Sequence, residues 1–301
     1  MFLFKHSDAA CGLMAEKIGI KEIMEQASFK QVVSNMDAQS RAISEFLAQG
    51  DAQAPVFVQS LPHRAPSRTI FFLQREEKHF HSALRLRLVW KMFDLCGSVF
   101  VCAPRRLIDL FAQRLCDAEQ WLHSFRCDTD VIHLLHTCAD ARLKEQGYLP
   151  ARGTGRIIHL FVCAGSMPKD RTNAVALSYS KLCDLENETT ISLTESYFSN
   201  RMAYGTVFDG KLVSIAAINP LSSYDQQYNS PVRDLCCETI PNYRKRGYAC
   251  QNVAALISAL QHQKLLPIYR CYSDNMSSVH LAKKLSLQCV ARVYHASYQQ
   301  R

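Results

Sequence analysis

The stretch Asn242–Cys250, NYRKRGYAC, contains three cationic side chains, one glycine and two tyrosines. The residues before it, Val232–Ile240 (VRDLCCETI), are rich in apolar and β-branched side chains and end at Pro241, which predicts a strand. The residues after it have the apolar spacing of one helix face, at Ala249, Val253, Leu256, Ile257 and Leu260. The predicted order is therefore strand, short basic turn and helix.

A helix that begins in this way can bind an anion. The N–H groups of its first turn have no partner within the helix and lie at the positive end of the helix dipole. Gly247 has no Cβ, so a ligand oxygen can approach the main chain closely. The side chains of residues 244–246 add positive charge that suits a diphosphate.

Two other interpretations of the basic cluster stay open. It could be a solvated turn on another α/β fold. It could also contact nucleic acid, although such sites usually spread basic and aromatic residues over a face, whereas this cluster is compact.

The composition predicts a folded, reduced protein. The chain has 301 residues, of which 48% are hydrophobic and 21% charged, as in globular proteins of one large or two ordinary domains. No window of eighteen apolar residues suggests a membrane helix. The net charge of +8 favours an anionic partner, and the odd number of 13 scattered cysteines favours a cytoplasmic location without structural disulfides.

A glycine- and proline-rich segment, residues 145–156 (EQGYLPARGTGR), predicts a domain boundary. It separates an N-terminal α/β domain over residues 1–150 from a second domain over residues 155–301. The first domain has a strand–helix–strand–helix rhythm, with predicted helices over residues 31–48, 78–96 and 105–115 and strands over residues 69–74 and 97–103. The second has a predicted strand over residues 157–164 and a hairpin that turns at Asp209-Gly210.

The spacing Arg244-x-x-Gly247-x-Ala249 after a strand resembles the pyrophosphate signature of the GNAT superfamily of acyl-CoA N-acyltransferases. The segment of residues 266–287, LPIYRCYSDNMSSVHLAKKLSL, is similar to the next strand and helix of that superfamily. The resemblance covers roughly residues 165–301, and its motifs lie within residues 232–290. It implies a GNAT fold of α/β (α+β) class, with a mixed sheet, flanking helices and an N-terminal domain that is a degenerate copy of the same fold.

The resemblance also implies a binding site for acetyl-CoA. The main chain of Arg244, Lys245, Arg246, Gly247, Tyr248 and Ala249 would cradle the pyrophosphate. Thr239 and Ile240, at the strand end, would bind the pantetheine arm in the manner of an added strand. Asn275 and Ser278 match positions that contact pantetheine, although Asn275 is equally well explained as a helix cap.

The catalytic residues match the superfamily less well. The usual general acid is a tyrosine seven residues after the asparagine, where this chain has Ala282. Tyr272 is the predicted replacement, with Ser278, Tyr294 and water as alternatives. The predicted general base is Glu238 and its alternative is Asp234, because the expected position itself holds Arg233.

The histidines and cysteines predict no metal site. His79, His81, His133, His136 and Cys138 lie in apolar patterns without the paired spacing of zinc ligands.

The sequence thus predicts an acetyl-CoA-dependent N-acetyltransferase that acts on a primary amine of unidentified origin. It is similar to two narrower groups, the glycine-N-acyltransferase-like enzymes and the zwittermicin-resistance-like acetyltransferases. Neither nucleic acid nor a membrane is an expected partner, and the oligomeric state is left open. The alternative is a non-catalytic module that binds acyl-CoA for regulation or interaction.

Overall fold

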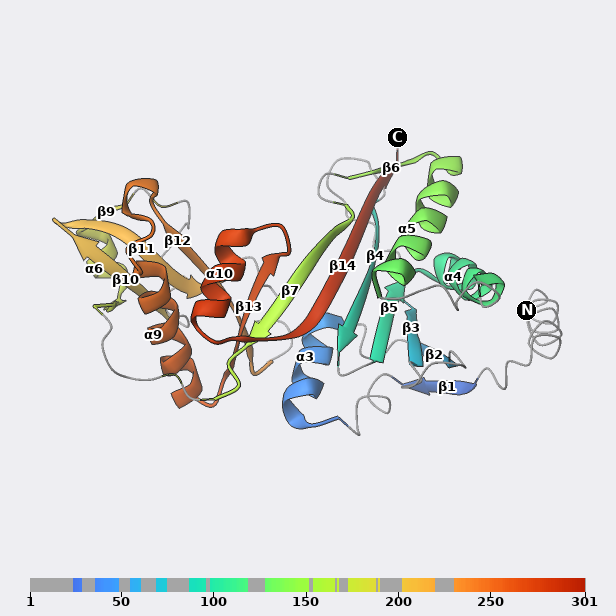
Figure 1. Ribbon diagram of the computed structural model, residues 1–301, viewed down its shortest axis with the longest axis horizontal. Helices are drawn as coiled ribbons and strands as arrows, with labels where there is room; N and C mark the ends of the chain where they lie inside the picture. The colour runs from blue at the N-terminus through green and yellow to red at the C-terminus, as the bar shows by residue number, and fades with distance from the viewer. Residues whose placement is uncertain are drawn as a thin grey trace. The chain divides into compact units, whose positions relative to one another are not determined.

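The chain folds into two compact units, which the computed structural model in Figure 1 shows. Unit 1 comprises Met1–Asn35, Asp51–Gly155 and His295–Arg301, and unit 2 comprises Met36–Gly50 and Arg156–Tyr294. The structure describes residues 24–28, 36–48, 55–60, 69–74, 87–95, 98–118, 128–151, 154–165, 167, 173–187, 189, 202–219 and 230–300.

Unit 2 is built on a mixed sheet with the strand order β14-β7-β13-β12-β11-β10-β8, and β9 pairs with β11. Its strands are β7 (Arg156–Val162), β8 (Val175–Leu177), β9 (Glu186–Asn187), β10 (Ala203–Phe208), β11 (Lys211–Ile218), β12 (Val232–Thr239), β13 (Leu266–Tyr272) and the first part of β14 (Gln288–Gln300). Strands β10, β11 and β12 are antiparallel, β12 and β13 are parallel, and β13 and β7 are antiparallel.

The hairpin of β10 and β11 turns where the sequence predicts. Asp209 and Gly210 have φ angles of 50° and 75°, as the tight turn between two twisted strands requires. Every residue of β11 from Leu212 to Ile218 is buried, so this strand is covered on both faces.

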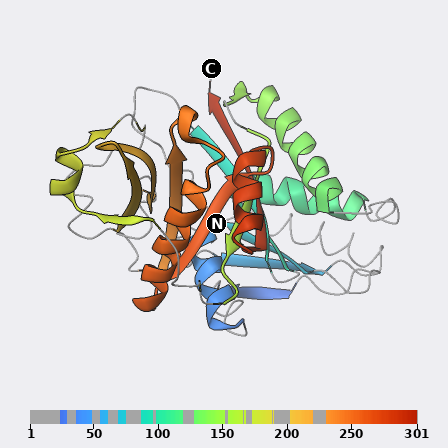
Figure 2. The same cartoon turned by 60° about the vertical axis from the view of Figure 1, so that its left-hand side comes forward.

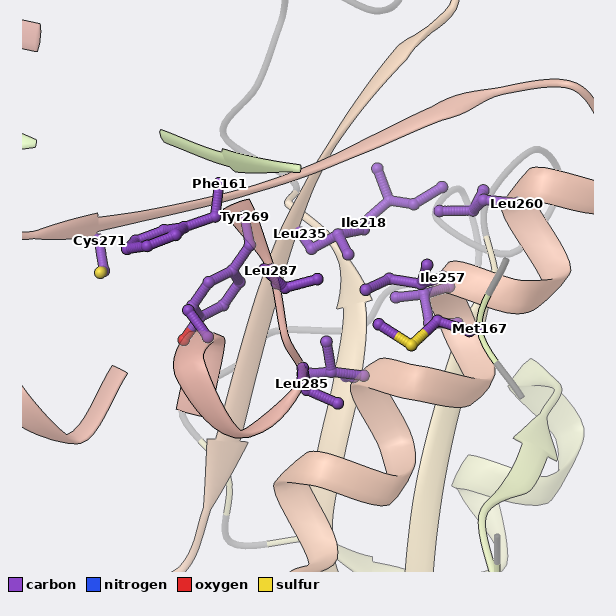
Figure 3. Close-up of a cluster of buried hydrophobic side chains, with 14 of the residues drawn as sticks. Phe161, Met167, Ile218, Leu235, Ile257, Leu260, Tyr269, Cys271, Leu285 and Leu287 are labelled. Carbon is purple, nitrogen blue, oxygen red and sulfur yellow. The ribbon is translucent and has the colours of Figure 1, made fainter. Parts of the chain in front are cut away.

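Two helices cover one face of this sheet, namely α9 (Tyr248–His262) and α10 (Met276–Lys284). Figure 2 shows α9 alongside the strands that precede and follow it. Apolar side chains of both helices join those of the sheet in one buried cluster, which Figure 3 shows from within. A second, smaller cluster includes Leu182 of the short helix α6 (Tyr179–Cys183) and Cys236 of β12. The fold class is therefore the predicted one, a mixed sheet with flanking helices.

Strands β12 and β13 pair over only part of their lengths. Val232–Leu235 pairs with Leu266–Tyr269, but β12 continues to Thr239 and β13 to Tyr272 without further pairing to each other. We call this opening between the two parallel strands the strand split. It begins directly after the pair of Leu235 and Tyr269.

Unit 1 contains a mixed sheet with the order β1-β2-β3-β5-β4-β14, and β6 also pairs with β14. Its elements are β1 (Met24–Ser28), β2 (Pro55–Ser60), β3 (Thr69–Gln74), β4 (Arg87–Leu95), β5 (Ser98–Ala103), α4 (Arg105–Ala118), α5 (Asp128–Glu145) and β6 (Tyr148–Pro150). The predicted strands over residues 69–74 and 97–103 and the predicted helix after Pro104 are confirmed.

The helix predicted over residues 78–96 is wrong, because Arg87–Leu95 forms strand β4. Residues 78–86 lie outside the described part. Trp90 packs on Phe111 at 5.0 Å between ring centroids, and Phe93 stacks on Phe100 at 4.8 Å. The side chains from Trp90 to Phe93 are all buried, as is typical of a strand covered on both faces. The period of such a run does not distinguish a strand from a buried helix.

The predicted helix over residues 31–48 is α3 (Ala38–Ala48), a part of unit 2, and residues 31–35 lie outside the described part. The carboxylate of Asp37 accepts a hydrogen bond from the N–H of Ser40 at 3.0 Å, so a capping residue sets the start of this helix.

The two units share one succession of strand pairings. In unit 1, β1, β2 and β3 are antiparallel, β3 and β5 are parallel, and β5 and β4 are antiparallel. Unit 2 repeats this with β10, β11, β12, β13 and β7. The parallel pair differs, because β3 and β5 stay paired without a break from Ile70 with Val99 to Gln74 with Ala103.

Candidate functional site

The predicted basic turn connects β12 to α9 through a short 3₁₀ helix, η3 (Pro241–Tyr243). Lys245 and Gly247 both have positive φ angles, 64° and 87°, which turn the chain sharply into the helix. Gly247 is the N-cap of α9 and offers no side chain to the first turn. The helix therefore begins with its N–H groups uncovered.

These N–H groups are available to a ligand. In the described part of the chain, no group accepts a hydrogen bond from the main-chain N–H groups of residues 245–250, and the first helical bond runs from Gln251 to Gly247. Unpartnered N–H groups at the positive end of a helix dipole are the usual receptor of a phosphate.

The basic side chains mainly brace the turn. The Nε of Arg244 donates to the carbonyl of Thr239 at 3.0 Å. The guanidinium of Arg246 donates to the carbonyl of Asn242 at 3.4 Å and lies 5.1 Å from the centre of the Tyr243 ring. Lys245 is exposed. The main chain of the turn, more than its charged side chains, is thus the part left available to an anion.

The strand split exposes main-chain groups of β12. Asp234 and Ile240 direct theirs to β11, since Asn219 donates to the Asp234 carbonyl at 2.7 Å and Ile240 donates to the Val213 carbonyl at 3.1 Å. By alternation, Cys237 and Thr239 direct their main-chain groups toward the split.

This alternation changes the expected pantetheine contacts. Both main-chain groups of Ile240 are occupied, because its carbonyl also accepts from the N–H of Tyr243 at 3.0 Å. Thr239 faces the split, although its carbonyl accepts from Arg244 and its hydroxyl bonds with that of Ser214 at 2.8 Å. Cys237, which the sequence analysis did not single out, is better placed than Thr239 or Ile240 to bond with pantetheine through its main chain.

The two residues predicted to be catalytic lie on the other face of the sheet from α9 and α10. Cys237 and Cys271 pack with those helices, so their neighbours Glu238 and Tyr272 point to the opposite face. Glu238 is half-buried. Tyr272 is 40% exposed and its ring lies 3.6 Å from the guanidinium of Arg156, which in turn donates to Asp274 at 2.7 and 2.8 Å.

Asp234, the alternative base, is held in an ion pair. Its side chain is 1% exposed, and Oδ2 accepts from Arg270 at 2.5 Å and from the amide of Asn219 at 2.9 Å. A carboxylate with these partners stabilises the sheet and is poorly placed to receive a proton from a substrate.

Asn275 is the N-cap of α10, and its side-chain oxygen accepts from the N–H of Ser278 at 3.2 Å. The helix-cap interpretation of Asn275 is thereby confirmed, and its contact with pantetheine stays a prediction. Burial raises the pKa of the Tyr269 hydroxyl on β13, and the Ser278 side chain near the start of α10 opposes part of that rise.

The family model of GNAT acetyltransferases matches residues 174–295, a segment that includes the split and the turn. This part of the chain belongs to the GNAT superfamily. Acyl transfer from an acyl-CoA is therefore the activity of its family. The match does not separate the two narrower groups to which the sequence is similar, and a search of curated proteins found no match.

Many solved structures resemble the chain weakly. A GCN5-related N-acetyltransferase-like protein from Streptococcus suis is 12% identical with a TM-score of 0.40, over 87% of this chain and 98% of that one. A GCN5-related N-acetyltransferase from Sphaerobacter thermophilus is 10% identical with a TM-score of 0.42, over 91% and 90%. A GNAT-family acetyltransferase from Colwellia psychrerythraea is 11% identical with a TM-score of 0.40, over 93% and 99%.

The position at which the resemblance places the general acid is part of the buried core. Ala282 of α10 is fully buried in the cluster shared by both helices and the sheet. The sequence analysis missed Tyr269, whose hydroxyl lies 3.7 Å from the sulfur of Cys237. The available signal was its place in the strand that follows α9, but a buried tyrosine in a strand is usually a core residue.

The residues that the structure describes contain no group of histidine, cysteine and acidic side chains that could hold a metal ion. His133, His136 and Cys138 lie on α5 in unit 1, and His79 and His81 lie outside the described part. None of the helices in the described ranges has both the length and the apolar character needed to span a membrane.

A cavity of about 810 Å³ lies at the C-terminal end of α9, whereas the basic turn precedes the N-terminal end of this helix. Its walls include Ala42 of α3 and Gln261, His262 and Leu265 around the end of α9. It contains none of the residues predicted to bind acyl-CoA.

Proposed function

We propose that the GNAT domain transfers an acetyl group from acetyl-CoA to a primary amine. The strand split carries this proposal, because it starts after Leu235 and Tyr269 and extends to the turn that precedes α9. A pantetheine arm laid between β12 and β13 would bond with the main chain of Cys237 and Thr239. Its diphosphate would then meet the N–H groups of residues 245–250.

The reaction in this geometry is a direct attack of the amine on the thioester carbonyl. Holding both reactants in line removes much of the entropic barrier. Glu238, on the face opposite α9 and α10, accepts the proton that the amine loses. The acceptor would therefore approach from that face, while the donor enters between the strands.

Unit 1 is, in this proposal, a degenerate copy of the GNAT fold that has lost the donor site. It keeps the succession of strand pairings, yet its parallel pair is unbroken from Ile70–Val99 to Gln74–Ala103. Over these described residues, the parallel pair has no split that would offer main-chain groups to a pantetheine arm.

Calorimetric titration with acetyl-CoA tests the donor site, and thiol release with a panel of small amines, aminoglycosides and peptides tests transfer. We expect micromolar binding and release of CoA with at least one amine. An Arg246→Ala/Gly247→Ala variant should bind acetyl-CoA much more weakly. Its turn loses the glycine that adopts a positive φ and the guanidinium that donates to the Asn242 carbonyl. Absence of binding by the wild type would contradict the proposal, whereas binding without release from any amine would favour a non-catalytic acyl-CoA module.

A further inference from the structure

Tyr269 occupies the position at which the strand split begins. It is the last residue of β13 that pairs with β12, opposite Leu235. The next residues of β12 run along the split, and Cys237 directs its main-chain groups into it. A thioester carried by a pantetheine arm in the split would therefore pass close to the side chain of Tyr269.

The hydroxyl of Tyr269 is the polar end of a buried ring. The residue is 4% exposed and belongs to the cluster with Phe161 and Leu287. In Figure 3 its oxygen points away from the side chains of Leu235 and Leu260. The hydroxyl lies 3.7 Å from the sulfur of Cys237, and the nearby Ser278 side chain opposes part of the rise in its pKa that burial causes. It thus joins β12, β13 and α10 at the start of the split.

We propose that Tyr269 is the general acid of the GNAT domain and donates its hydroxyl proton to the sulfur of the departing CoA. This assignment rests on the proposed acyl transfer. It gives the domain a proton donor on the sheet face that α10 covers. In α10 itself, Ala282 stands where the superfamily usually has its general-acid tyrosine. Tyr272, the replacement predicted from the sequence, points to the opposite face and lies under Arg156.

The step conserves protons and electrons. The amine nitrogen forms a bond with the carbonyl carbon, and Glu238 takes one proton from that nitrogen. When the carbon–sulfur bond breaks, its electron pair stays on sulfur and the Tyr269 proton moves to it, which yields the CoA thiol. Ser278 then returns a proton to the phenolate and is itself reprotonated by water, since it is only half-buried.

The surroundings favour a neutral tyrosine beside the sulfur. Burial raises the pKa of Tyr269 and also that of the Cys237 thiol, so neither group is ionised at neutral pH. A CoA thiolate at the same buried place would carry the same desolvation penalty, which drives its protonation. The Ser278 side chain opposes part of this rise in the Tyr269 pKa and so stabilises the transient phenolate.

A Tyr269→Phe variant tests the assignment, because it removes only the hydroxyl. We expect kcat to fall by about 100-fold or more, as general acids contribute, while the dissociation constant of acetyl-CoA changes less than about threefold. The matched control is Tyr298→Phe, which removes an equally buried hydroxyl from unit 1. An unchanged kcat in Tyr269→Phe, with the variant shown to be folded by near-UV circular dichroism, overturns the proposal.

A second measurement needs no acceptor. The thiol of bound CoA is titrated by the ultraviolet absorbance of its thiolate, with the desulfo-CoA complex as the blank for protein groups. A hydrogen bond from Tyr269 to sulfur should hold the pKa of that thiol about one unit lower in the wild type than in Tyr269→Phe. Equal values overturn the contact even if acyl transfer is intact. A lowered value in a protein that transfers to no amine would retain the contact and contradict the proposed function instead.

Discussion

Asp234 and Arg270 form an ion pair between β12 and β13 next to the point where the two strands separate, with 2.5 Å between Oδ2 and the guanidinium nitrogen. The last paired residues, Leu235 and Tyr269, are their immediate neighbours in the chain. Asn219 donates to the same carboxylate oxygen from the end of β11. The ion pair therefore fixes three neighbouring strands where the split begins.

Arg270→Leu should destabilise the protein more than Asp234→Asn does. Asp234 is 1% exposed and would remain as a buried charge, whereas Arg270 is 26% exposed and can turn to water. We expect a loss of about 3 kcal/mol for Arg270→Leu and about 1 kcal/mol for Asp234→Asn, since removing one partner of a buried pair is costly. Urea unfolding of both variants measures the difference, and the reverse order would contradict this account of the ion pair.

Gly247→Ala should weaken acetyl-CoA binding through the main chain. An alanine Cβ at this position would meet no atom within 4 Å, so strain at a φ of 87° is the only direct effect. Relief of that strain would rotate the N–H groups at the start of α9. We expect a stability loss of about 1 kcal/mol and at least about tenfold weaker binding of acetyl-CoA.

Gly210→Ala is the matched control for this substitution. Gly210 has a φ of 75° in the hairpin turn and is equally free of contacts. It should lose similar stability and keep the affinity for acetyl-CoA. Equal loss of affinity in both variants would show that the effect of Gly247→Ala is a general loss of folding.

The turn could be read from the sequence because its signals are local. Gly247 and the apolar spacing from Ala249 to Leu260 lie within a few residues of one another, and α9 begins at Tyr248. The roles of Tyr269 and Cys237 could not be read in this way. They depend on where pairing between two strands stops, which follows from contacts between residues far apart in the chain.

The error over residues 78–96 has a similar cause. The side chains from Trp90 to Phe93 are apolar or, in Lys91, buried, so the segment has no period that separates a strand from a helix. Packing against Phe100 of β5 and Phe111 of α4 decides the outcome. The role of Asp234 in the site was likewise not predictable from its local sequence, because its ion-pair partner Arg270 lies on another strand.

The protein should lose stability at alkaline pH. Burial raises the pKa of the Cys271 thiol from 9.0 to about 11. The folded state then binds more protons than the unfolded state between pH 9 and 11, so stability is full below pH 9 and falls as the pH rises. A shift of this size corresponds to a loss of about 2–3 kcal/mol above pH 11.

A Cys271→Val variant isolates this contribution. Urea unfolding under reducing conditions at pH 8 and pH 11 gives the loss for each protein. The loss in the variant should be smaller by about 2 kcal/mol, because valine cannot ionise. An identical loss in both proteins would assign the alkaline effect to other groups.

Glu238→Gln should slow acyl transfer without weakening donor binding. Its side chain points to the face opposite the helices, whereas the donor site is formed by main chain at the split and the turn. We expect kcat at neutral pH to fall by about 100-fold and to recover as the pH rises, because more of the acceptor amine is then unprotonated. The affinity for acetyl-CoA serves as the control. A neutral-pH kcat equal to that of the wild type would show that water or another group removes the proton.

Each chain should bind one molecule of acetyl-CoA, although both units have the same succession of strand pairings. In unit 2 the chain between the parallel strands forms the turn and α9, and the strands then separate. In unit 1 the described residues between the parallel strands are those of β4, and β3 and β5 remain paired to Gln74 and Ala103. Over its described residues, unit 1 therefore has no strand split in which a pantetheine arm would lie. Calorimetric titration should give a stoichiometry of about one, and the Arg246→Ala/Gly247→Ala variant should show no second class of sites. Two equivalents of acetyl-CoA, or tight binding that survives in this variant, would place a functional donor site in unit 1 and contradict its interpretation as a degenerate copy.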